Sequence, residues 1–154
     1  MSVPVVLMIG ALVLFRSQPN EITISFVGDI MLSRGVQSYL EEFGYDYPYE
    51  DVRDLFLQDD LTVGNLECPI TDYENAANKA KRFLFKADAE NASALKRAGF
   101  DCLNLANNHT MDYTSPGLLD TMTHLEANGL DYVGASENAA SKKPYIFEKN
   151  GIRV

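Results

Sequence analysis

Short segments in which apolar and polar residues alternate recur along the chain, separated by longer segments with a different spacing. Residues 21–29 read EITISFVGD, so that apolar side chains fall at every second position, with Thr23 and Ser25 between them. A period of two with β-branched residues predicts a strand, and the closing Gly-Asp predicts a loop after it. The same kind of pattern predicts further strands at residues 60–67, 82–87, 100–106 and 131–135.

Helical spacing, with apolar residues three or four positions apart, fills the segments between these strands. Four helices are predicted, at residues 32–44, 49–58, 89–99 and 117–129. Glycines at the ends of the first, third and fourth helices are expected to act as C-caps, because glycine readily adopts the left-handed conformation: Gly44, Gly99 and Gly129. Capping or proline residues are expected at the helix starts: Ser33, Asp88, Ser115 and Pro116.

Two of the helices carry a clear apolar face that is expected to cover the sheet. In the second helix this face consists of Val52, Leu55 and Phe56. In the fourth helix it consists of Leu118, Leu119, Met122 and Leu125. His124 lies away from that stripe and is expected on a solvated helix face.

The order of the elements predicts the fold class. The final residues, PYIFEKNGIRV, predict a hairpin with Asn150 and Gly151 in a tight turn. Before them, strands alternate with helices, which predicts an α/β protein with a mostly parallel sheet and right-handed crossovers. In such sheets ligands bind beyond the carboxyl ends of the strands, so the chemistry is expected there.

The amino-acid composition limits the classes of function that are expected for this chain. The chain has 154 residues, enough for one domain, and its 22 acidic against 13 basic residues give a net charge of −9. A nucleic-acid binder needs a basic surface for the phosphate backbone, so nucleic acid is not expected as a partner. The excess acidity is interpreted mainly as a contribution to solubility.

The two cysteines do not form a disulfide framework. Cys68 and Cys102 match no zinc-binding spacing, and both flank apolar segments, which predicts buried thiols. A mutual disulfide is the alternative, and it requires a demanding geometry.

The N-terminus carries an uncharged apolar segment, VPVVLMIGALVLF, at residues 3–15. As a helix it would rise about 20 Å, against about 30 Å of bilayer hydrocarbon, which is short for a spanning helix and typical of a signal-peptide core. No Lys or Arg precedes it. Residues 1–20 are interpreted as a secretory signal or an N-terminal membrane anchor with its linker, ahead of a domain at residues 21–154. The alternative is a buried strand or helix of that domain.

Polar groups follow three of the predicted strands directly. They are Asp29 after the first strand, Asn65 and Glu67 at the end of the second, and Asn107, Asn108, His109 and Asp112 after the fourth. Taken singly, these are ordinary turn acids, Asn caps or a structural histidine. Because parallel strands bring their carboxyl ends to one edge, their oxygen and nitrogen donors together indicate a divalent-metal site.

Four separated segments carry a resemblance to a known family. FVGDIML, GNLECPIT, FKAD and GFDCLNLANNHTMDY, the last followed by GLLDTMTHLEANGLDYVGA, resemble the CapA family of bacterial poly-γ-glutamate capsule biosynthesis proteins. That family looks like a branch of the calcineurin-like metallophosphoesterase superfamily. The resemblance runs from residue 22 to 154. It implies an α/β/β/α sandwich, of which this chain would be the N-terminal half, truncated at its C-terminus and inactive alone.

The resemblance also assigns site roles. It implies divalent metal ions (Mn, Zn or Fe), held by Asp29, Asn65, Glu67 and Asn108. His109 would hydrogen-bond or protonate a phosphate oxygen or leaving group, and Asp112 would orient His109. One departure is Met31, which stands where many superfamily enzymes have a histidine, and methionine is a poor ligand for hard divalent metals.

The function implied is synthesis or export of an anionic surface polymer at the cell membrane by an extracytoplasmic domain. The partners implied are capsule synthase and export proteins, together with the polymer or a phosphoester substrate. Two alternatives share the same residues. One is a general metal-dependent phosphoesterase, and the other is a non-catalytic binding module on the same fold.

Overall fold

The structure is a computed structural model that describes residues 20–77, 81–138 and 144–154. The predicted signal or anchor segment therefore lies almost wholly outside the described residues. Within the described residues, no helix is both long and apolar enough to cross a bilayer.

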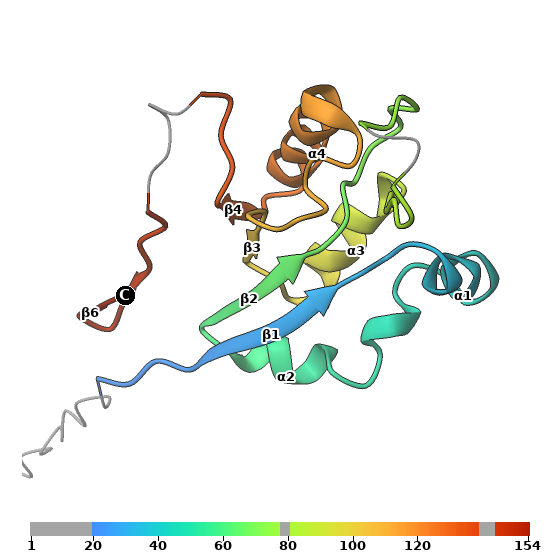
Figure 1. The fold of residues 1–154 in the computed structure, drawn as a ribbon. Helices are drawn as coiled ribbons and strands as arrows, with labels where there is room; N and C mark the ends of the chain where they lie inside the picture. Colours follow the sequence, from blue (N-terminus) through green and yellow to red (C-terminus); the bar gives the residue numbers. More distant parts are fainter. Residues whose placement is uncertain (1–19, 78–80, 139–143) are drawn as a thin grey trace, which may run out of the picture.

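A four-stranded parallel sheet forms the centre of the molecule, with strand order β1-β2-β3-β4 (Figure 1). The strands of this sheet are β1 Ile24–Ile30, β2 Leu61–Leu66, β3 Cys102–Asn104 and β4 Asp131–Val133. The helices between them are α1 Gly35–Phe43, the 3-10 helix η1 Tyr47–Tyr49, α2 Arg53–Gln58, α3 Glu90–Ala98 and α4 Thr114–Ala127. The alternation of strand and helix confirms the predicted α/β class.

The core lies where α3 and α4 pack against the sheet (Figure 1). Leu95 of α3 and Leu125 of α4 are fully buried, as is Leu103 of β3. Full burial of a side chain of this size stabilises the fold by about 1.5–3 kcal/mol relative to exposure. This packing fixes the direction of the strands, and with it the edge at which their polar ends meet.

The predicted hairpin at the C-terminus is confirmed, with strands β5 Glu148–Lys149 and β6 Ile152–Arg153. Asn150 and Gly151 have φ values of 54° and 77°, as a two-residue turn of this kind requires. The Asn150 side chain donates a hydrogen bond to the carbonyl of Glu21 at 3.0 Å, so the hairpin is tied to the segment ahead of β1.

Both predicted N-caps of α1 and α3 are wrong, because their side chains bind elsewhere. The Ser33 hydroxyl accepts a hydrogen bond from the Lys86 backbone N–H at 3.3 Å, and the N-cap of α1 is Arg34. The Asp88 carboxylate accepts one from the Tyr45 hydroxyl at 2.8 Å. In both cases the side chain that the local sequence predicts as an N-cap forms a tertiary hydrogen bond instead. The glycine stops at the ends of α1 and α3 are confirmed.

The strand predicted at residues 82–87 does not form. The segment makes one isolated parallel bridge, between Ile70 and Ala87. Its backbone is used in another way, since the N–H of Phe85 donates to the Asp112 carboxylate at 2.8 Å. Apolar residues therefore occupy every second position of this segment, although it forms no ladder of hydrogen bonds with a neighbouring strand.

The predicted apolar faces are only partly buried. In α2, Phe56 is buried but Leu55 is 58% exposed. In α4, Met122 and Leu125 are buried and Leu119 is not. Each helix meets the core along a narrower stripe than its sequence pattern indicates.

Both cysteines are buried free thiols, as predicted. Burial raises the pKa of Cys68 to about 12 and that of Cys102 to about 11. The Cys68 sulfur also accepts a hydrogen bond from the Leu32 N–H at 3.4 Å. The two thiols are thus protonated packing groups at neutral pH.

Gly64 in β2 provides a test of the packing beneath the strand ends. A Cβ at this position would lie 2.5 Å from the Ile30 Cδ1 and 3.0 Å from Phe100 Cε1. We expect Gly64→Ala to lower the free energy of unfolding by about 1–3 kcal/mol, measured by urea denaturation. Gly35→Ala is the matched control, because a Cβ there meets nothing within 4 Å. Equal stability of the two variants would show that the β1–β2 packing is looser than described.

Candidate functional site

A row of three polar side chains crosses the carboxyl edge of the sheet. Asp29 of β1 pairs in register with Asn65 of β2, and Asn65 pairs with Asn104 of β3. The Asn65 amide nitrogen donates to Asp29 Oδ1 at 2.7 Å, and the Asn104 amide nitrogen donates to Asn65 Oδ1 at 2.8 Å. We call these three residues the strand-end row.

A β-bulge in β1 brings Asp29 into this row. Phe26 pairs with Val63 and Asp29 pairs with Asn65, so three steps along β1 match two along β2. Side chains alternate between the faces of a strand, so without the extra residue Asp29 would point to the opposite face of the sheet from Asn65. The bulge, which contains Gly28, therefore decides that the first predicted site residue reaches the second.

Asn107 anchors the loop that follows β3, and its amide orientation is fixed by backbone groups. Its Oδ1 accepts from the N–H groups of His109 and Thr110 at 3.0 and 3.1 Å. Its Nδ2 donates to the Leu66 carbonyl at 2.8 Å and to Asn65 Oδ1 at 3.2 Å. A backbone N–H only donates and a carbonyl only accepts, so exchanging the amide oxygen and nitrogen would break all of these bonds.

This orientation sets the polarity of the whole row. Asn65 must present its oxygen to the donors on Asn107 and Asn104, so its NH₂ group faces the Asp29 carboxylate. Hydrogen bonds that run in one direction polarise one another. Both polar atoms of Asn65 are thus engaged within the protein, and a metal-ligand role for it would require breaking one of these bonds.

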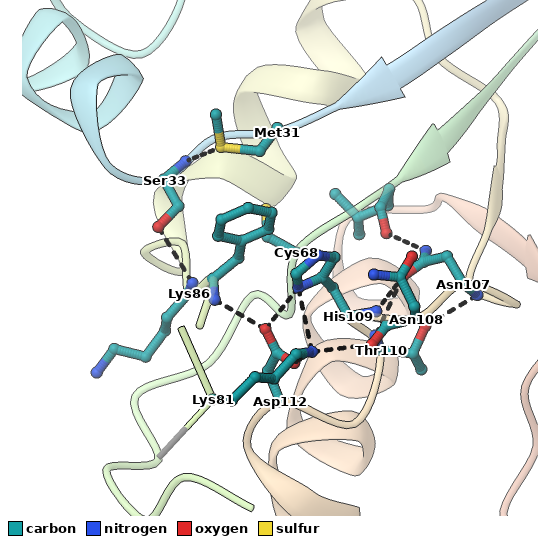
Figure 2. A network of polar contacts seen from close by, with 12 residues as sticks. Met31, Ser33, Cys68, Lys81, Lys86, Asn107, Asn108, His109, Thr110 and Asp112 are labelled. Atoms are coloured by element: carbon teal, nitrogen blue, oxygen red, sulfur yellow. Dashed lines mark hydrogen bonds and ion pairs between the residues drawn. The ribbon is translucent and has the colours of Figure 1, made fainter. Parts of the chain in front are cut away.

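The second part of the site is a buried ion-pair cluster around Asp112 (Figure 2). The Asp112 side chain is only 1% exposed. Its carboxylate lies 2.8 Å from His109 Nδ1, accepts the Phe85 N–H at 2.8 Å, and pairs with the Lys81 ammonium. Lys81 also donates to the Asn108 carbonyl at 3.1 Å, which holds the loop from a second side.

These contacts determine which ring nitrogen of His109 carries the proton. The Asp112 carboxylate, at 2.8 Å, can only accept, whereas the Lys81 ammonium lies at 3.5 Å from the same Nδ1, so the shorter contact assigns the proton to Nδ1. In that tautomer Nε2 keeps its lone pair. Among residues 20–77, 81–138 and 144–154, none is hydrogen-bonded to Nε2. The Phe85 ring stacks on the imidazole, with centroids 4.0 Å apart and planes 21° apart, which fixes the ring plane.

The pKa of Asp112 is lowered in spite of its position. Burial on its own raises the pKa, but the hydrogen bonds from Lys81, His109 and the Phe85 N–H together lower it below the ordinary value. Asp112 is therefore ionised at neutral pH, and it stabilises any positive charge that His109 acquires.

The proposed metal ligands are only partly brought together. Asp29 and Asn65 are in contact, whereas Glu67 and Asn108 make no side-chain hydrogen bond with either of them. Carboxylate and amide oxygens suit a hard divalent metal. Within the described part of the chain, however, no three His, Cys, Asp or Glu side chains lie close enough together to hold a metal ion. Met31 does not replace a ligand here, since its sulfur accepts the Ser33 N–H at 3.4 Å.

Three residues of the site were missed in the sequence: Asn104, Lys81 and Phe85. Asn104 had a usable signal, because it lies near the end of its predicted strand and, like Asn65, is followed by a leucine. Lys81 and Phe85 had none, because their partner Asp112 lies about thirty residues further along the chain.

The molecule is an α/β protein whose parallel sheet carries a polar row and a His–Asp pair at its strand ends, an arrangement consistent with the metallophosphoesterase-like fold. The chain belongs to the family described as bacterial capsule synthesis protein PGA_cap, whose model matches residues 23–154. This confirms the resemblance to the CapA family and the fold class that it implied.

Curated relatives agree with this family. The chain is 38% identical over 143 residues to "Capsule biosynthesis protein CapA" of Bacillus anthracis, covering 90% of the chain and 35% of that protein. It is 36% identical over 135 residues to "PGA biosynthesis protein CapA" of Bacillus subtilis, covering 86% of the chain and 36% of that protein. An uncharacterized protein of Sinorhizobium fredii is 28% identical over 122 residues. The chain thus spans about a third of the length of the two CapA relatives.

Asn107 offers a test of the amide orientation. We expect Asn107→Asp to destabilise the protein by about 1–3 kcal/mol at neutral pH, because an oxygen would then face the Leu66 carbonyl and the Asn65 oxygen. Asn108→Asp is the matched control, since Asn108 is exposed and offers only its backbone carbonyl to Lys81; we expect a change within about 0.5 kcal/mol. Thermal and urea unfolding of both variants measures this, and equal losses would contradict the orientation.

The lowered pKa of Asp112 predicts a pH-dependent contribution to stability. Because its folded-state pKa lies below the unfolded value of about 3.9, its contribution is complete above that value and is lost as the pH falls through the folded-state pKa. We expect Asp112→Ala to cost roughly 3 kcal/mol at pH 7 and progressively less below pH 4. Urea unfolding at several pH values tests this, with the exposed Asp51→Ala as control. A cost that does not change with pH would contradict it.

Proposed function

We propose that this chain supplies the strand-end part of a metallophosphatase-like centre that acts in the synthesis or export of an anionic capsule polymer. The proposal has two supports. The relatives are named capsule and PGA biosynthesis proteins. The observation that carries it is the pairing of His109 with the buried Asp112, beside the strand-end row that leads to Asp29.

The chemistry available to His109 is proton transfer. With Nδ1 bound to Asp112, Nε2 is the atom that can accept a hydrogen bond or, once protonated, donate to a phosphate oxygen or leaving group. Asp112 stabilises the imidazolium that forms, and the stacked Phe85 ring limits rotation of the imidazole. Asp112 acts as a positioning residue, because it is buried and reaches a substrate only through His109.

A divalent ion, with Mn, Zn and Fe as the candidates, would be held by Asp29, Glu67 and Asn108. Bound metal would supply Lewis-acid stabilisation of a phosphoryl group and a hydroxide at neutral pH. These donors do not form a complete site by themselves, so such an ion requires further ligands. Asn65 contributes by holding the Asp29 carboxylate in place.

A binding module without turnover is the second candidate. It is favoured by Met31, whose sulfur is used in a turn, and by the lack of three clustered acidic, His or Cys donors in the described residues. A general metal-dependent phosphoesterase is the third candidate function. Metal binding without hydrolysis of any phosphoester would favour the binding module over both enzymes.

The place of action proposed is the cell envelope, with the domain outside the cytoplasm, and the partners proposed are membrane-bound synthase and export proteins. The supports are the printed names of the relatives and the apolar segment at residues 3–15. The polymer proposed is poly-γ-glutamate, a chain of repeated carboxylates.

His109 gives the decisive variant. In a polymer-producing host lacking its own copy, we expect His109→Gln, made in a protein extended to the full length of the CapA relatives, to reduce both capsule polymer and Mn²⁺-dependent hydrolysis of a chromogenic phosphoester by about 10²-fold or more. His124→Gln is the matched control, because that imidazole lies on α4 beside Asp120, away from the strand ends. Full polymer production with His109→Gln would exclude the proton-transfer role. Loss of polymer without any phosphoesterase activity in the wild type would favour the binding module.

A further inference from the structure

Basic residues gather beside the site although the chain as a whole is strongly acidic. Four of them lie in or against the segment 81–86: Arg34, Lys81, Arg82 and Lys86. Lys81 is paired with Asp112, and Lys86 with Glu74. Arg34 and Arg82 form no ion pair with any of the residues that the structure describes. Two positive charges therefore have no carboxylate partner within the described residues.

Both of these arginines pack on the same aromatic ring. The guanidinium carbon of Arg34 lies 4.9 Å from the Phe83 ring centroid, and that of Arg82 lies 5.1 Å from it. Phe83 is 41% exposed, so its ring is available at the surface to both guanidinium groups. Packing on an aromatic ring orders a guanidinium group and leaves its N–H groups free to bind an oxyanion.

The backbone of Arg34 is strained. Its φ of 57° with ψ of −127° lies in a region that suits glycine and costs other residues about 1–3 kcal/mol. The turn is held by its neighbour Ser33, which binds the Lys86 N–H through its hydroxyl and the Met31 sulfur through its N–H. A glycine here would avoid the strain, but it would also remove the guanidinium group that packs on Phe83.

This surface adjoins the candidate site. Phe85, two residues after Phe83, stacks on His109, and Lys81, one residue before Arg82, pairs with Asp112. Arg82 and Phe83 therefore belong to the same short segment, residues 81–85, that holds His109 and Asp112. We call Arg34, Arg82 and Phe83 the arginine platform.

We propose that the arginine platform binds successive carboxylates of an anionic polymer and guides it towards His109. Two guanidinium groups that share one ring present two separate sites for oxyanions, which suits a ligand with repeated charges better than a single small ion. The inference deepens the proposed function and rests on it for the identity of the polymer.

The test uses the purified protein and a fluorescently labelled oligomer of γ-linked glutamate, with binding followed by fluorescence anisotropy at low ionic strength. We expect Arg82→Gln to weaken binding about threefold to fivefold, as the loss of an exposed ion pair does, and the double variant with Arg34→Gln to weaken it further. Arg53→Gln is the matched control, because Arg53 is exposed on α2 and has no ion pair with a described residue. Equal affinity of Arg82→Gln and Arg53→Gln would overturn the proposal.

Arg34→Gly separates binding from folding. It removes the charge and also relieves the backbone strain, so we expect a higher melting temperature together with weaker binding of the oligomer. A more stable protein with unchanged binding would overturn the role of Arg34.

Inorganic phosphate, added as competitor, is expected to displace the oligomer only at much higher concentration. Displacement at equal concentration would show an unselective anion site and overturn the preference for a polymer.

The His109→Gln variant distinguishes failure of this proposal from failure of the proposed function. We expect it to bind the oligomer as the wild type does, because His109 is not part of the arginine platform. If capsule synthesis survives His109→Gln while Arg82→Gln still weakens binding, the proton-transfer function fails and the platform stands. If His109→Gln abolishes synthesis while Arg82→Gln binds normally, the platform fails and the function stands.

Discussion

The buried carboxylate of Asp112 is the interaction on which the site depends. It joins two segments that the sheet does not hold together: the irregular stretch at residues 81–85 and the loop between β3 and α4. An ionised group removed from water is costly unless it is fully paired, and Asp112 meets a lysine, a histidine and a backbone N–H. The same three bonds fix His109, place Phe85 over the imidazole and hold the segment that carries Arg82 and Phe83.

The strand-end row is a second constraint, and it depends on register. Parallel pairing places Asp29, Asn65 and Asn104 side by side, but only because a bulge in β1 adds one residue before Asp29. Asn107 then sets the direction in which every amide of the row points. The result is a preorganised edge, in which an exposed carboxylate is oriented by groups whose own positions are fixed by the backbone. Such preorganisation is what electrostatic catalysis and selective binding both require.

These two constraints explain how much could be predicted from sequence. Alternation and helical spacing predict the parallel sheet, its strand ends and the glycine stops, because those signals are local. The β-bulge in β1 has no local sequence signal, because GDI after an apolar segment has the pattern of an ordinary strand end. Ser33 and Asp88 have the chemistry of N-caps, but tertiary partners bind them. Residues 82–87 have the period of a strand, but their backbone serves Asp112 instead of a neighbouring strand. Lys81 could not be found at all without knowing that Asp112 is buried.

The protonation of the His109 ring tests the central claim most directly. Two-bond ¹H–¹⁵N correlation NMR on protein labelled at the histidine nitrogens distinguishes Nδ1–H from Nε2–H in the neutral ring, and His124 provides an internal reference. With Asp112 accepting from Nδ1, the expected result is a protonated Nδ1 and an unprotonated Nε2, reversed or mixed in Asp112→Ala. A neutral His109 with the proton on Nε2 in the wild type would contradict the pairing, and with it the proposed role of His109.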